Sequence, residues 1–180
     1  MGKQYSEISE TLQGFIEAQK LFFVATAAND GRVNVSPKGM DSLRVLGSNR
    51  VAWLNVTGSG NETAAHLLDT NRMTLMFCAF EGSPMILRLY GRAKAYHPRD
   101  QKWQELLELF PTIPGSRNIF DMTVDLVQTS CGMAVPYFDF VAERDDLKTW
   151  ATNKGEKLGD YWLEKNQRSI DGMATGILEP

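Results

Sequence analysis

The spacing of hydrophobic and polar residues along this chain alternates between a period of two and a period near 3.6. Short runs with the composition or alternation typical of strands lie at residues 22–28, 32–36, 43–46 and 51–54. Asn29-Asp30-Gly31 separates the first two runs, and an Asp-Gly pair tolerates the positive φ of a tight turn. We therefore predict antiparallel hairpins, with one strand ending at Pro37, which has no N–H to donate.

The second half of the chain contains longer elements of both kinds. Further strands are expected at residues 73–80, 85–96 and 118–127, with a bulge or bend at Gly91. Apolar residues at spacings of three and four predict helices at residues 6–20 and 98–110, and a shorter helix is expected at 62–69. From residue 143 onward the chain is polar and is expected to be helical.

Short strands in hairpin order around one core favour a small antiparallel barrel, closed or half open, over a parallel sheet. The predicted fold class is therefore mainly β (α+β) with flanking helices. A chain of 180 residues is most simply one domain, with the barrel at about 20–142 and a helical C-terminal extension at about 143–180.

Composition narrows the classes of function. Hydrophobic residues make up 43% of the chain and charged residues 23%, which supports a folded core. The formal net charge is −3 and no basic run appears, so no nucleic-acid partner is expected. No apolar run approaches the length of a membrane span. Cys78 and Cys131 are both interpreted as buried thiols in a reducing compartment, which predicts a cytoplasmic protein without membrane contact.

The most informative chemistry lies at residues 55–68. An apolar strand leads into a loop of glycine and hydroxyl residues, and a helix-forming run follows at once. The first N–H groups of a helix have no intrahelical partner and lie at the positive end of the helix dipole, so they favour an anion. Gly58 and Gly60 allow backbone to approach a ligand closely. Uncharged donors come from Thr57, Ser59, Asn61 and Thr63, and the pattern predicts a phosphate site.

The same residues also fit an ordinary loop in which Asn61 caps the helix. The loop is not a P-loop, because no Gly-Lys-Ser/Thr follows, and Gly58-x-Gly60 lacks the third glycine of a dinucleotide-binding turn. Glu62 would repel an anion unless its carboxylate points away or accepts hydrogen bonds from hydroxyl or imide groups of the ligand. Both interpretations of the loop remain open at this point.

Other kinds of site lack their motifs. The chain has two histidines, His66 and His97, with no carboxylate pattern beside them, so no metal site is expected. The absence of a Gly-x-Ser-x-Gly turn argues against a serine hydrolase. His66 is interpreted as a residue on a helix face, and no catalytic side chain is assigned.

Five longer segments occur in a recognisable order: Phe-Phe-Val-Ala-Thr-Ala at 22–27, Val-Asn-Val-Ser-Pro-Lys-Gly at 33–39, Thr-Gly-Ser-Gly-Asn-Glu-Thr-Ala-Ala-His-Leu at 57–67, Met-Thr-Leu-Met-Phe-Cys-Ala-Phe-Glu-Gly at 73–82 and Ile-Leu-Arg-Leu-Tyr-Gly-Arg-Ala at 86–93. In this order they resemble the pyridoxamine-5′-phosphate-oxidase-like family, the split β-barrels that bind flavin mononucleotide (FMN). Ser130-Cys131-Gly132 and the segment at 168–172 are similar to a less studied branch of that family.

The resemblance implies a homodimer with FMN at the subunit interface and a small-molecule substrate. In the family, one strand places a lysine near the flavin phosphate, which would be Lys38 here, with Val35 and Ser36 along the flavin ring. The following loop and helix would supply the other cofactor contacts: Thr57, Gly58, Ser59, Gly60, Asn61, Glu62 and Thr63.

Two departures from the family pattern bear on activity. The true oxidases carry an arginine where Val33 stands, and basic residues where Gly60, Asn61 and Glu62 stand. The resemblance therefore implies an FMN-dependent oxidoreductase of unidentified substrate, in a branch other than the pyridoxamine-phosphate oxidases. The alternatives are a non-catalytic flavin- or haem-binding module and a deazaflavin-dependent reductase.

Overall fold

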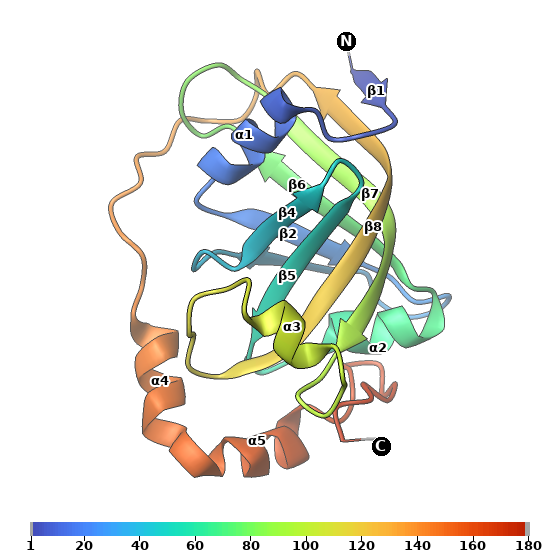
Figure 1. Ribbon diagram of the computed structural model, residues 1–180, viewed down its shortest axis with the longest axis vertical. Helices are drawn as coiled ribbons and strands as arrows, with labels where there is room; N and C mark the ends of the chain where they lie inside the picture. The colour runs from blue at the N-terminus through green and yellow to red at the C-terminus, as the bar shows by residue number, and fades with distance from the viewer. Residues whose placement is uncertain (1, 179–180) are drawn as a thin grey trace.

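Eight strands form one sheet in the computed structural model, which describes residues 2–178 (Figure 1). The strands are β1 (Lys3–Tyr5), β2 (Phe22–Thr26), β3 (Asn34–Lys38), β4 (Leu43–Gly47), β5 (Arg50–Val56), β6 (Arg72–Cys78), β7 (Ile86–Tyr96) and β8 (Ser116–Ser130). Their order in the sheet is β3-β2-β6-β7-β8-β5-β4, with β1 paired to β8, and every pairing is antiparallel.

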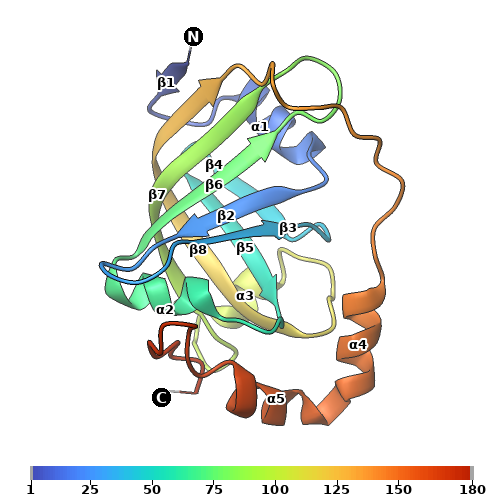
Figure 2. The same cartoon turned by 180° about the vertical axis from the view of Figure 1, so that it is seen from behind.

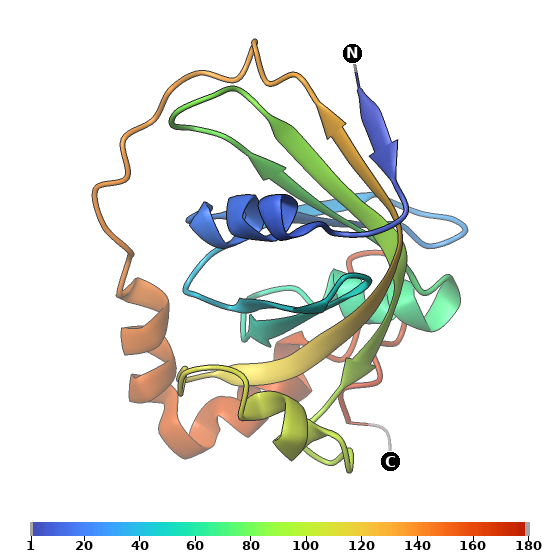
Figure 3. The same ribbon diagram turned by 45° about the horizontal axis from the view of Figure 1, so that its top comes forward.

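The sheet curves into a barrel that remains open between its two end strands, β3 and β4. Figure 3 shows the curvature, with β2 and β5 on opposite sides of the interior. This arrangement confirms the predicted fold class, a mainly β protein built on an antiparallel split barrel with a helical C-terminal segment. The hairpin predicted at Asn29-Asp30-Gly31 is also confirmed, because β2 and β3 pair on either side of it.

Aromatic side chains fill the interior of the barrel. Trp53 of β5 stacks on Phe120 of β8 with ring centroids 4.7 Å apart, and Phe22 of β2 stacks on Phe77 of β6 at 5.8 Å. An edge contact of 6.2 Å between Phe22 and Trp53 joins the two pairs across the interior. None of the four residues is more than 5% exposed, and burial of a side chain of this size contributes roughly 1.5–3 kcal/mol.

The helices of the described residues are α1 (Glu10–Ala18), α2 (Glu62–Asp69), α3 (Trp103–Leu107), α4 (Asp146–Lys154) and α5 (Leu158–Lys165), with a 3-10 turn, η1 (Gly155–Lys157), between the last two. The helix predicted at 6–20 is shorter because Ser9 caps it, its side chain accepting from the Leu12 N–H at 3.3 Å. The helix predicted at 98–110 is also shorter, since the chain beyond α3 continues with bonds from residue i to i−3.

Two predictions about strand irregularities have opposite outcomes. Pro37 does not end a strand: β3 runs through it to Lys38, and Pro37 lies opposite Phe23 of β2. An end strand has a neighbour on one side only, so a residue without an N–H is tolerated where its nitrogen faces away. The bulge at Gly91 is confirmed by a register shift between β7 and β8, where a Cβ would lie 2.0 Å from the Thr123 carbonyl oxygen.

The C-terminal part of the chain lies outside the barrel. Residues 131–145 cross from the end of β8 to α4 without regular structure, and α4 and α5 confirm the predicted helical tail (Figure 1). Residues 166–177 then return beneath α2, as Figure 2 shows. Among residues 2–178, no helix is both long enough and apolar enough to cross a membrane.

The prediction that both cysteines are buried is wrong for one of them. Cys78 at the end of β6 is buried, whereas Cys131 is exposed, and both are free thiols. Cys131 follows the last residue of β8, where the chain leaves the sheet and no second layer covers it.

Candidate functional site

A pocket of about 390 Å³ lies at the opening of the barrel. One wall comes from β3 at one end of the sheet, and the facing wall comes from β5, next to the other end. The loop after β5, the first turn of α2 and the start of β8 complete it. Its lining residues are Asn34, Ser36, Lys38, Trp53, Asn55, Val56, Gly58, Ser59, Gly60, Asn61, Glu62, Thr63 and Arg117. The structure therefore brings together all the residues predicted from sequence except Val35 and Thr57.

The alternation of β3 decides which of its side chains face the pocket. Asn34, Ser36 and Lys38 line it, whereas Val35 projects from the opposite face of the strand and is 60% exposed. Any contact of Val35 with a ligand in this pocket would therefore use its backbone.

Thr57 is buried beneath the loop and does not line the pocket. Its hydroxyl donates to the Gly115 carbonyl at 2.8 Å and accepts from Trp162 Nε1 at 2.9 Å. Thr57 thus ties the start of the loop to β8 and to α5, and its hydroxyl is already engaged within the protein.

The carbonyl groups of the loop are engaged by side chains of β8 and of the C-terminal segment. Arg117 Nη1 donates to the Gly60 carbonyl at 3.0 Å, and Asn166 Nδ2 donates to the carbonyls of Gly58 at 3.1 Å and Ser59 at 3.3 Å. In the part of the chain that the structure describes, the N–H groups of these three loop residues have no protein acceptor. These donors, together with the first turn of α2, are available to an oxyanion.

Arg117 is the charged residue that sequence reasoning missed. It lies at the start of β8, is 3% exposed, and donates from Nη1 to Asn166 Oδ1 at 2.8 Å. Its Nε atom is buried with no partner among the described residues. Burial lowers the pKa of Arg117 to about 10, so the guanidinium remains charged at neutral pH. No local pattern indicated this role, because Arg117 is followed by Asn118 and the Gly58 carbonyl that it approaches lies 59 residues earlier.

Lys38 supplies a second positive charge to the same pocket. Its Nζ lies 5.2 Å from the centroid of the Trp53 ring, and within residues 2–178 neither Lys38 nor Arg117 forms an ion pair with a carboxylate. Burial first, and the charge of Arg117 second, lower the pKa of Lys38 to about 8. A bound anion would relieve this repulsion, so the two cations favour a negatively charged ligand.

Glu62 also lines the pocket. Its Oε2 accepts from the Ile170 N–H at 2.9 Å, so one carboxylate oxygen is engaged by the C-terminal segment, whereas Oε1 lies beside Gly60 and the negative charge partly offsets the lowering of the Arg117 pKa. Asn61 is the N-cap residue of α2, as the alternative interpretation predicted, but its side chain makes no cap bond. Instead, Asn61 Nδ2 donates to the Asn166 carbonyl at 3.2 Å, and Asn61 Oδ1 is buried without a partner among the described residues.

Neither histidine lines the pocket. The ring of His66 is buried on α2, with Nδ1 3.1 Å from the hydroxyl of Thr26. Burial lowers the pKa of His97 to about 4, so its ring is neutral at pH 7. Among residues 2–178 no group of three His, Cys, Asp or Glu side chains could hold a metal ion.

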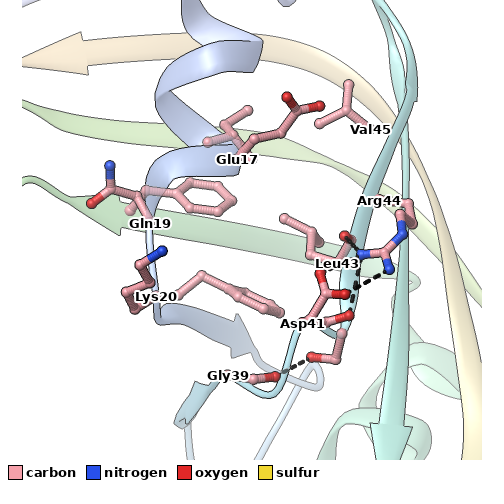
Figure 4. Close-up of a pocket in the computed structure, with 12 residues that line it drawn as sticks. Glu17, Gln19, Lys20, Gly39, Asp41, Leu43, Arg44 and Val45 are labelled. Carbon is pink, nitrogen blue, oxygen red and sulfur yellow. Dashed lines mark hydrogen bonds and ion pairs between the residues drawn. The ribbon is translucent and has the colours of Figure 1, made fainter. Parts of the chain in front are cut away.

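A second pocket, of about 290 Å³, lies between α1 and β4 (Figure 4). Its arginine, Arg44, already pairs with Asp41 at 2.8 Å, and the carboxylate of Glu17 also lines it. Its floor is apolar, including Phe22 and Phe77. The paired charges make this pocket a poorer site for phosphate than the pocket beside Lys38.

Comparison with known proteins agrees with this architecture. The family described as "Pyridoxamine 5'-phosphate oxidase" matches residues 8–131. The pyridoxamine 5′-phosphate oxidase family protein ustO of Aspergillus flavus is 32% identical over 189 residues, covering 94% of this chain and 76% of that protein. Two crystal structures share the fold. A putative pyridoxamine 5′-phosphate oxidase from Lactobacillus delbrueckii is 17% identical, with a TM-score of 0.54 and coverage of 68% of this chain and 94% of that one. HupZ of Group A Streptococcus is 18% identical, with a TM-score of 0.53 and coverage of 66% of this chain and 91% of that one.

Proposed function

This chain belongs to the pyridoxamine 5′-phosphate oxidase family, and from that premise we propose that it binds FMN, with the phosphate beside Lys38 and Arg117, and acts as an oxidoreductase on a small molecule. The observation that carries the proposal is the pair of cations without carboxylate partners, facing loop amides that have no protein acceptor within residues 2–178. A volume of about 390 Å³ also falls in the range of small-molecule sites, about 300–1,000 Å³.

The polar atoms left without partners match the two parts of a sugar-alcohol phosphate. Arg117 Nε can donate only, which suits a phosphate oxygen. Asn61 Oδ1 can accept only, which suits a hydroxyl group, and the amide orientation is fixed because Asn61 Nδ2 donates to a carbonyl. FMN carries both groups, since its phosphate ends a chain of hydroxyl-bearing carbons.

When bound, the flavin ring would supply the hydride or electron transfer. The protein's own residues would bind and orient the cofactor: Lys38 and Arg117 by charge, the loop amides by hydrogen bonding, and Ser36 and Asn34 along β3. The buried face of Trp53 closes the pocket on the barrel side. No side chain of this chain is assigned a proton-transfer role.

The proposal includes a homodimer, which the family implies. Val35 is 60% exposed on the outer face of β3, the strand whose inner face lines the pocket, and Val33, directly before that strand, is 70% exposed. A partner packed on that outer face would bury both valines next to the cofactor site. Val35→Arg should therefore shift the protein toward monomer, as measured by light scattering. The control is Val141→Arg, at a position that is 93% exposed between β8 and α4, and it should leave the oligomeric state unchanged. Equal oligomeric states for wild type and Val35→Arg would exclude β3 as the interface.

The direct test is to purify the protein, record its absorption spectrum, and identify by mass the small molecule released on denaturation. FMN is the expected product. Release of a deazaflavin or of haem would instead support the corresponding alternative function. Haem is disfavoured because no histidine or cysteine lines this pocket to ligate its iron. Flavin that is bound but never reduced by nicotinamide nucleotides or other donors would favour the non-catalytic module. A colourless protein that takes up no FMN would overturn the proposal.

A further inference from the structure

The residues from 161 to 177, here called the C-terminal latch, are attached to the proposed site through hydrogen bonds and an ion pair. Trp162 donates to Thr57 beneath the loop, and the Ile170 N–H donates to Glu62 in the first turn of α2. Asp171 accepts from both the backbone and the side chain of Arg32 in the turn before β3. The latch therefore reaches the strand, the loop and the helix that together surround the pocket.

Asn166 lies at the centre of these contacts and is 0% exposed. Its Oδ1 accepts from Arg117 Nη1 at 2.8 Å, and its Nδ2 donates to the carbonyls of Gly58 and Ser59. Its own carbonyl accepts from Asn61 Nδ2 at 3.2 Å. One buried asparagine thus connects the guanidinium of the pocket to three residues of the loop.

These bonds decide which polar groups of the loop face the pocket. Peptide carbonyl oxygens carry partial negative charge and would repel a phosphate group. With Asn166 and Arg117 engaging the carbonyls of Gly58, Ser59 and Gly60, the loop can offer its N–H groups instead. Neutral Asn166 also fixes Arg117 without cancelling its charge, which a carboxylate at this position would do.

We propose that Asn166 is a positioning residue of the anion site, and that docking of the C-terminal latch and binding of a phosphate group at Lys38 and Arg117 stabilise each other. The inference rests on the proposed function, because it assumes that the pocket takes a phosphate ester. Linkage makes the coupling reciprocal: a docked latch raises phosphate affinity, and bound phosphate strengthens docking by the same factor.

The first test compares two ligands that differ only in the phosphate group, FMN and riboflavin, on the full-length protein. Asn166→Ala should raise the Kd for FMN about tenfold while leaving the Kd for riboflavin nearly unchanged, since only the phosphate contacts are disturbed. Asn153→Ala, an exposed asparagine on α4, is the matched control and should change neither Kd. A merely structural role for Asn166 would weaken both ligands equally.

The second test needs no flavin. Amide hydrogen exchange at residues 57–63 should be faster in Asn166→Ala than in wild type and in Asn153→Ala, because the loop has lost its anchor. Conversely, adding inorganic phosphate to wild type should slow exchange at residues 161–177. Should Asn166→Ala fail to fold, as judged by circular dichroism, a second variant is Trp162→Phe, which keeps a smaller aromatic ring and removes the bond to Thr57. It should produce the same changes in exchange with a smaller magnitude.

The outcomes separate the two hypotheses. Wild type that binds FMN more tightly than riboflavin, with the same preference and the same loop exchange in Asn166→Ala, would overturn the inference and leave the proposed function standing. Wild type that binds no flavin would overturn the proposed function and the coupling, and the exchange rates at 57–63 would still show whether Asn166 orders the loop.

Discussion

The barrel and the C-terminal latch are built by different interactions. In the barrel, Trp53 and Phe120 are at most 2% exposed and stack on each other among other apolar side chains. In the latch, Asn166 is equally buried but every contact described for it is a hydrogen bond. Hydrophobic burial is roughly proportional to area and non-directional, whereas a hydrogen bond requires particular atoms at about 2.9 Å.

This difference suggests that the barrel determines the stability of the fold, whereas the C-terminal latch determines the orientation of the loop. The net contribution of a hydrogen bond to folding is only about 0.5–1.5 kcal/mol, because the unfolded chain bonds to water. Several such bonds can nevertheless select one conformation of a loop. We therefore expect changes in the barrel to lower the free energy of unfolding, and changes in the latch or the pocket to lower ligand affinity.

The largest effect is expected from Trp53→Ala. Removing this ring leaves a cavity against Phe120 and Phe22, which should lower the free energy of unfolding by about 3–5 kcal/mol in urea denaturation. Trp150→Ala on α4, where the ring is half-buried and contacts Tyr161 at 5.0 Å, is the matched control and should destabilise much less. Equal losses would mean that the tail contributes as much stability as the barrel.

Lys38→Ala should separate affinity from stability. Loss of one charge-assisted contact, worth about 1.5–3 kcal/mol, should weaken FMN binding roughly ten- to a hundredfold, as measured by flavin fluorescence. The unfolding curve of the protein without ligand should not shift downward, because a half-buried cation beside Arg117 is not stabilising. Lys94→Ala, exposed on β7, should leave the affinity unchanged. An unchanged dissociation constant for Lys38→Ala would place the phosphate elsewhere.

The depressed pKa of Lys38, about 8, predicts a pH dependence with a definite sign. An anion binds the protonated amine, and the second pKa of a phosphate ester is about 6. FMN affinity should therefore be level between about pH 7 and pH 8 and fall by up to tenfold per pH unit above that range. Stability of the ligand-free protein should change in the opposite sense. Between pH 8 and the unfolded value of 10.5, the unfolded chain carries the proton and the folded one does not, so stability rises with pH. Lys38→Ala should abolish both slopes, and a slope of affinity that survives this substitution would contradict the assignment.

The smallest effect is expected from Trp162→Phe. The substitution keeps an aromatic ring on α5 and removes only the bond from Nε1 to Thr57, worth about 0.5–1.5 kcal/mol. A thermal melt should move by a few degrees at most, and FMN affinity should fall by less than in Lys38→Ala. A loss of stability comparable to that of Trp53→Ala would remove the distinction between barrel and latch.

Local chemistry accounts for what could be predicted. The alternation of residues 32–36 predicted a strand with one solvated or ligand-facing side, and the Gly58-Ser59-Gly60 loop predicted an anion site. Both predictions depend on residues adjacent in the chain, and the structure places the loop and Ser36 in one pocket. The failures concern neighbours distant in sequence. Pro37 is tolerated because β3 ends the sheet, and Cys131 is exposed because nothing packs over the end of β8.

The amino-acid sequence by itself determined the strands, the hairpins and the antiparallel barrel, since periodicity and turn chemistry act over a few residues. Lys38, one cation of the pocket, was predicted only from the family resemblance. Only the tertiary structure decided that Arg117 is buried beside Lys38 and that Asn166 binds both Arg117 and the carbonyls of Gly58 and Ser59. Asn166 and Gly58 are 108 residues apart, and no local pattern specifies such a pair. Their meeting depends on how the curved, open sheet brings its end strands toward each other and on where the C-terminal segment returns.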